Sequence, residues 1–108
     1  MSKNKITLEE LIDKSKAVME KYQKEFPDVK VDRDYFPFKI TEEWGECLQT
    51  YLMLTGRGRQ KDKSKKEIEE EFNGEFADVF AFLLLFAEHE GVDLAEALEE
   101  KWFRRLNK

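Results

Sequence analysis

Apolar residues recur along the chain at helical spacing, in four blocks separated by proline, glycine or strongly polar segments. In the first block they follow an i, i+3, i+4, i+7 rhythm from Thr7 to Phe26 and stop at Pro27. Thr7 has a glutamate three residues later, Glu10, and this spacing is typical of a capping box. The pattern predicts an all-α fold whose first helix begins after Thr7.

The second block is preceded by residues 27–38, which contain two prolines and no clear period and are interpreted as a connector. The second helix is expected to begin between Pro37 and Thr41, because proline suits a first helical turn and threonine can cap it. It is expected to end at Gly56. The basic segment 55–65 that follows is typical of a solvated loop. The alternative is that its basic residues fold back over a polyphosphate.

Ser64 and Glu67 form a second capping box, and the third helix is expected to run from there to about His89 and to stop at Gly91. Asp93 is expected to cap a fourth helix. The apolar residues of this last helix, which are expected to point inward, are Leu94, Ala97, Leu98, Trp102 and Leu106.

Two of these helices carry a pair of carboxylates three residues apart, Glu43 with Glu46 and Glu75 with Asp78. At about 100° per residue, each pair lies at one edge of the apolar stripe of its helix. If the two stripes pack together, the four carboxylates converge at the border of the core. Uncompensated negative charge is costly there, and a divalent cation would remove that cost.

Carboxylates without a histidine or cysteine partner are oxygen ligands that suit Mg²⁺, or Mn²⁺, rather than zinc or copper. Mg²⁺ often completes its coordination with substrate phosphates, which indicates phosphoryl or nucleotidyl chemistry. A di-iron bundle needs Glu-x-x-His on two helices. The single histidine, His89, has Phe86 three residues before it and lies about three turns after Asp78, so the sequence argues against that centre.

Composition and charge indicate the number of domains and the kinds of partner. The 108 residues are expected to form one domain, 1–108, and the net charge of −5 argues against binding of a nucleic-acid polymer. Nine Phe and two Trp are many aromatic residues for this length, and a core shared with further copies, in a dimer or tetramer, would use them.

The sequence also predicts a cytoplasmic protein that does not cross a membrane. A single cysteine, Cys47, allows no disulfide within the chain and is expected to be buried on the apolar face of its helix. The N-terminal stretch lacks the apolar segment of a signal peptide. The longest apolar run, 79–87, is too short to span a bilayer.

The segments EEWGE (42–46) and EFAD (75–78) resemble the EExxE and ExxD motifs of the MazG family of all-α nucleoside triphosphate pyrophosphohydrolases, which is related to dimeric dUTPases and dCTP pyrophosphatases. The resemblance covers roughly residues 36–105. It implies a four-helix MazG-like bundle completed by oligomerisation. It also implies Mg²⁺-dependent hydrolysis of a (deoxy)nucleoside triphosphate to the monophosphate and pyrophosphate.

The resemblance also assigns roles to individual residues. The implied metal ligands are Glu43, Glu46, Glu75 and Asp78. Glu46 would also activate the attacking water, supported by Glu42. The implied substrate-binding residues are Lys101, Arg104 and Asn107 for the phosphates and Phe36 and Trp44 for the base. Basic residues in a last helical turn also favour the helix dipole without any ligand, and Phe36 and Trp44 are also compatible with a purely packing role.

Two alternatives remain open at this point. The chain is also compatible with a non-catalytic helical interaction module in which the acidic residues are ordinary surface. A nucleotide-sensing module would keep the metal site and bind a nucleotide without turnover.

Overall fold

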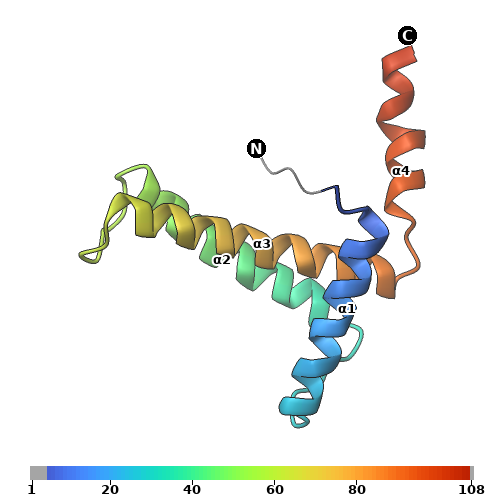
Figure 1. Cartoon of the computed structure of the whole chain (residues 1–108), viewed down its shortest axis with the longest axis horizontal. Helices are drawn as coiled ribbons and strands as arrows, with labels where there is room; N and C mark the ends of the chain where they lie inside the picture. The colour runs from blue at the N-terminus through green and yellow to red at the C-terminus, as the bar shows by residue number, and fades with distance from the viewer. Residues whose placement is uncertain (1–4, 108) are drawn as a thin grey trace.

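The structure, a computed structural model, describes residues 5–107, and over that range it is helical without strands (Figure 1). The elements in chain order are α1 (Leu8–Glu25), α2 (Tyr35–Leu54), α3 (Lys65–His89), α4 (Leu94–Lys101) and the 3₁₀ helix η1 (Phe103–Asn107). The all-α prediction is confirmed. Over the described range, no helix combines the length and apolar character needed to cross a bilayer. Residues 1–4, part of the stretch examined for a signal peptide, lie outside the described residues.

The predicted caps determine where three of the helices begin. Thr7 and Ser64 each form a complete capping box, and the hydroxyl of each accepts a hydrogen bond of 3.1 Å from the amide three residues later. Asp93 accepts one from the Glu96 amide at 3.0 Å. These side chains satisfy amide groups that have no partner within the first turn. The predicted starts of α1, α3 and α4 are confirmed.

The predicted start of α2 is wrong. The helix begins at Tyr35 with Asp34 at the cap position, so the last residues of the expected connector are helical. Pro37 lies in the first turn, where a missing amide hydrogen breaks no intrahelical bond. Thr41 is inside the helix, and its hydroxyl donates to the Pro37 carbonyl at 3.1 Å. At the other end, Gly56 adopts a φ of +71° just after the helix, which suits glycine because it has no Cβ.

Helices α2 and α3 form an antiparallel pair at the centre of the structure, and α1 crosses α3 near the C-terminal end of that helix (Figure 1). An ion pair of 3.5 Å between Lys16 and Glu88 joins α1 to α3. The buried apolar residues belong to α2 and α3 and are Phe36, Cys47, Met53, Ile68, Val79, Leu84 and Leu85. The core therefore lies mainly between these two helices, and Cys47 is buried as expected.

The apolar stripes of α2 and α3 meet as expected, but only one edge of each stripe is buried in the contact: Cys47 and Val79 are buried, and the Trp44 and Phe76 rings meet at 6.4 Å beside them. On α2 the buried side is centred on Glu43, Cys47 and Thr50. Trp44, about 100° further round the helix, keeps 45% of its surface exposed, and Phe80 on α3 keeps 46%. The four carboxylates lie at the border of this contact, as expected. Glu43 is nearly buried and Glu75 is partly buried, whereas Glu46 and Asp78 are exposed.

Helix α4 also departs from expectation. It contains no buried residue, and it extends away from the α2–α3 pair, packing mainly against η1 (Figure 1). Of the apolar residues expected to point inward, Leu94 is partly buried, whereas Leu98, Trp102 and Leu106 are exposed. The four helices of one chain therefore do not close a bundle by themselves, and its completion by oligomerisation stays a prediction.

We expect Ser64→Ala to lower the free energy of unfolding by about 0.5–2 kcal/mol, because it removes one acceptor and opens the capping box of α3. Thermal unfolding followed by circular dichroism measures the effect. Ser64→Asp keeps an acceptor at the same position and is the matched control, so a loss as large as that of alanine would contradict the capping role.

Candidate metal centre

Five carboxylates from α2 and α3 meet in the contact between these helices. Carboxylate oxygens of Glu42, Glu43 and Glu46 all lie within 4.8 Å of one another. The same limit holds for oxygens of Glu43, Glu75 and Asp78. Glu43 belongs to both groups, so the two predicted pairs and Glu42 form one acidic cluster. The structure thus brings together all four residues predicted to bind the metal.

The acidic cluster has a buried side and an open side. Only 9% of the surface of Glu43 is exposed, and Glu75 is partly buried. Glu46 and Asp78 are exposed. The Oε2 atom of Glu75 is shielded from solvent and has no hydrogen-bond partner among the described residues. A buried acceptor without a partner is costly, and for a carboxylate a cation is the natural partner. The donor set therefore fits a hard divalent cation such as Mg²⁺ or Mn²⁺.

Electrostatics within the acidic cluster also favour added positive charge. Burial raises the pKa of Glu43, the carboxylates of Glu46 and Asp78 raise it further, and Lys39 opposes them. Burial raises the pKa of Glu75 as well, followed by the charges of Glu46, Asp78 and Glu71. For Asp78, burial and Glu46 raise the pKa, and Lys39 lowers it. Each of these acids resists losing its proton because of burial and like charge.

Lys39 is a member of this centre that the sequence reasoning missed. Its ammonium group forms ion pairs with Glu42 and, at 3.5 Å, with Glu43. The hydrogen bond to Glu42 is the main cause that raises the pKa of Lys39. A signal was present, because Lys39 precedes Glu42 and Glu43 by three and four residues on one helix, which is the spacing of helical ion pairs.

The residues predicted to bind phosphates lie elsewhere in the chain. Lys101 ends α4, and Arg104 and Asn107 belong to η1, in the part of the chain that extends away from α2 and α3 (Figure 1). One chain in this conformation does not bring them to the acidic cluster, and their role stays a prediction. The basic loop is tied to α3 through an ion pair between Lys63 and Glu71, one turn before Glu75. Its alternative role over a polyphosphate is untested.

The two aromatic residues predicted to contact a base differ in their surroundings. Phe36 is buried and packs against Tyr35 and His89, with ring centroids 5.7 Å apart in both cases. Trp44 is half exposed and meets Phe76 edge to face at 6.4 Å. Phe36 thus contributes to the core at one end of the helix pair, and Trp44 offers an accessible ring. Base binding by either residue stays a prediction.

Comparison of the chain with protein-family models, with curated proteins and with solved structures found no match. The similarity to the MazG motifs therefore rests on segments 42–46 and 75–78 and their placement on adjacent helices.

We expect Glu43→Gln to stabilise the metal-free protein by about 0.5–2 kcal/mol, because it removes one of several close negative charges at a buried position. Thermal unfolding in the presence of EDTA measures this. Glu70→Gln, an exposed acid on α3 outside the acidic cluster, is the matched control and should leave the free energy of unfolding nearly unchanged. Destabilisation by Glu43→Gln would contradict the repulsion.

The metal-free protein should also become more stable as the pH falls from neutral toward about 5. The pKa values of Glu43, Glu75 and Asp78 are raised in the folded state, so this state binds more protons than the unfolded chain above their ordinary values. Stability is therefore lost as the pH rises through the raised pKa values.

Melting temperatures in EDTA across this pH range test this expectation. In Glu43→Gln the dependence should be weaker than in the wild type. Glu67, whose pKa is lowered by the Ser64 cap, acts in the opposite direction at lower pH and does not mask the effect. An equal pH dependence in the wild type and Glu43→Gln would contradict the assignment.

Proposed function

We propose that this protein is a Mg²⁺-dependent nucleoside triphosphate pyrophosphohydrolase, which converts a (deoxy)nucleoside triphosphate to the monophosphate and pyrophosphate. The observation that carries the proposal is the convergence of carboxylates from α2 and α3, including a buried Glu75 oxygen that has no hydrogen-bond partner within residues 5–107. The motif resemblance supplies the reaction class.

Within this proposal the role of each carboxylate follows from its burial. Glu43 and Glu75, on the buried side, would hold the cation, and Glu46 and Asp78 would complete the set of ligands from the open side, which a substrate could reach. Bound Mg²⁺ would neutralise the charge of the triphosphate and orient its phosphates. The raised pKa values of Glu43, Glu75 and Asp78 fit a site built to receive positive charge.

Glu46 is the proposed general base. It is exposed at the rim beside Glu42, so a water molecule can reach its carboxylate. The water oxygen forms a bond to the α-phosphorus, the bond to the bridging oxygen of the β-phosphate breaks, and the water proton passes to Glu46. Pyrophosphate leaves with the bonding electron pair. Glu42 supports Glu46 from the same helix.

Lys39 is added to the mechanism on geometric grounds. In this structure its ammonium group balances Glu42 and Glu43. When a cation takes over the charge of Glu43, Lys39 would keep Glu42 as its partner and would have donors left for a phosphate oxygen. Lys101, Arg104 and Asn107 remain proposed phosphate contacts, and they require a second chain or a different position of α4 and η1.

Two observations are also compatible with functions other than hydrolysis. The exposed apolar residues of α2 and α3 fit a helical interaction module. The same acidic cluster would also serve a nucleotide sensor that binds without turnover. Activity distinguishes them, because only the enzyme releases pyrophosphate.

Purified protein with millimolar Mg²⁺ should release pyrophosphate from at least one member of a panel of ribo- and deoxynucleoside triphosphates. The readout is phosphate detected after added inorganic pyrophosphatase, and EDTA should abolish the release. Nucleotide binding without release would indicate a sensor, and no binding and no release with any triphosphate would remove the proposal.

We expect Glu46→Gln to reduce kcat by about 10²-fold or more, because an amide cannot accept the water proton. Asp78→Asn should instead raise the Mg²⁺ concentration needed for half-maximal activity. Glu70→Gln is the control and should retain wild-type rates. Full activity of Glu46→Gln at saturating Mg²⁺ would exclude Glu46 as the base.

A further inference from the structure

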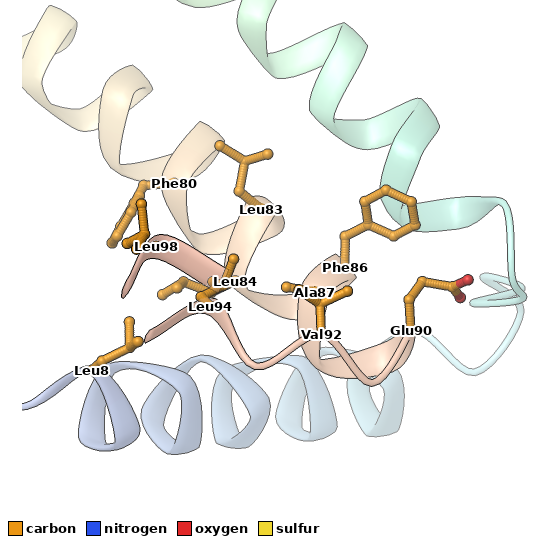
Figure 2. A pocket seen from close by; sticks show the side chains of 10 residues that line it. All are labelled: Leu8, Phe80, Leu83, Leu84, Phe86, Ala87, Glu90, Val92, Leu94 and Leu98. Atoms are coloured by element: carbon orange, nitrogen blue, oxygen red, sulfur yellow. The ribbon is translucent and has the colours of Figure 1, made fainter. Parts of the chain in front are cut away.

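Ion pairs at the C-terminal end of α3 tie this helix to neighbouring segments at a distance from the acidic cluster. Glu88 pairs with Lys16 of α1 at 3.5 Å, and Glu90, just after α3, pairs with Arg33 at 3.8 Å. Figure 2 shows Glu90 at the edge of an apolar cavity of about 530 Å³, with its carboxylate pointing away from the leucine side chains. At about 1.5 Å per residue, Glu88 lies about 15 Å along the helix axis from Asp78.

One ion pair of α3 lies much closer to the acidic cluster. Lys63, the residue before the Ser64 cap, pairs with Glu71 at 2.5 Å. Glu71 precedes Glu75 by four residues, and side chains with this spacing are neighbours on a helix, with about 5–6 Å between their Cβ atoms. The Lys63–Glu71 pair therefore lies beside the buried side of the acidic cluster.

Glu71 faces the same side of α3 as the acids of the cluster. At about 100° per residue, Glu71 and Asp78 lie about 40° and 60° to the same side of Glu75. Burial is the main cause that raises the pKa of Glu75, and the charge of Glu71 adds to it, so the two acids are within electrostatic reach. Glu71 nevertheless belongs to neither group of converging carboxylates. A change of side-chain rotamer would bring its carboxylate toward Glu75.

The connector between α2 and α3 holds Lys63 in place at a conformational cost. Lys61 and Asp62 have φ angles of +54° and +58°, in the left-handed region that residues with a Cβ rarely adopt. The Lys63 amide donates to the Gln60 carbonyl at 3.1 Å, and the Gln60 side chain donates to the Met53 carbonyl at 2.8 Å. The connector is thus attached to the end of α2 through Gln60 and to α3 through Lys63.

The stability gained from the Lys63–Glu71 pair does not explain that cost. The two side chains remain 34% and 35% exposed, and ion pairs that water can reach contribute little to folding. Two consecutive residues in the left-handed region cost more than such a pair returns. Backbone strain that persists in a fold is concentrated at functional sites. The position of Lys63 is therefore better explained by its effect on Glu71.

We propose that Lys63 is a positioning residue of the acidic cluster, because its ion pair holds Glu71 away from Glu75. The inference rests on the proposed function, since the metal centre is the site on which Lys63 acts. With Glu71 held back, Glu75 shares a bound cation with Asp78. Without Lys63, the Glu71 carboxylate would turn toward Glu75 and replace Asp78 as a ligand. The cation would then move toward the start of α3 and away from Glu43.

Cation affinity in the absence of nucleotide tests this inference, because it requires no turnover. Titration calorimetry with Mg²⁺ gives the dissociation constant. In the wild-type background, Asp78→Asn should raise this constant about tenfold or more, because a carboxylate ligand is lost. In the Lys63→Met background, the same substitution should raise it by less than about threefold, because Glu71 replaces the lost ligand.

Three further backgrounds identify the cause. Lys63→Arg keeps the ion pair and should preserve the full effect of Asp78→Asn. Lys63→Met combined with Glu71→Gln should restore that effect, since no carboxylate is left to replace Asp78. Lys16→Met removes the ammonium group from the ion pair at the C-terminal end of α3 and is the matched control, in which the effect of Asp78→Asn should be unchanged.

The outcomes separate this inference from the proposed function. An equal effect of Asp78→Asn in the wild type and in Lys63→Met would overturn the role of Lys63 and leave the metal centre in place. Failure of Glu71→Gln to restore the effect would do the same. Loss of folding in Lys63→Met, seen by circular dichroism, would assign the ion pair a structural role and also overturn the proposal. A wild type that binds no Mg²⁺ at millimolar concentration would remove the metal centre itself.

Discussion

The structure depends on carboxylates placed in the contact between α2 and α3. Glu43 is nearly buried there, and Glu75 has an oxygen that receives no hydrogen bond among the described residues. Close negative charges in such a contact lower the free energy of unfolding unless positive charge compensates them. Lys39 provides part of that charge from the same helix as Glu43. In the proposed metal centre, the stability that the contact gives up in the free protein would be returned as affinity for a cation.

Charged and apolar side chains lie on different sides of the α2–α3 pair. One side carries the acidic cluster and Lys39, and the other carries exposed apolar residues, among them Trp44 and Phe80. Because successive helical residues are about 100° apart, Glu43 and Trp44 are neighbours in sequence and still belong to different sides. A phosphate ligand at the proposed metal centre would therefore leave the exposed apolar residues of α2 and α3 uncovered.

Local rules accounted for much of the secondary structure. Thr7, Ser64 and Asp93 cap their helices as the sequence indicates, because a capping side chain acts within three residues. The start of α2 lies two residues before the expected range, since Asp34 and Pro37 are also compatible with a loop, whereas in the structure the first turn of the helix buries Phe36. The positions of the acidic pairs on adjacent helices were predicted correctly from their spacing. The spacing of Lys39 from Glu42 and Glu43 would have allowed its ion pairs to be predicted in the same way.

The sequence by itself determined the helices, their caps and the convergence of Glu43, Glu46, Glu75 and Asp78, because these follow from spacing along one helix and from a short connection between two. Only the tertiary structure decided which side of α2 and α3 is buried and where α4 lies. Helical periodicity describes a stripe, but it does not say which neighbour covers that stripe. The choice depends on contacts between residues distant in sequence, such as those of Trp44 with Phe76 and of Tyr51 with Phe72.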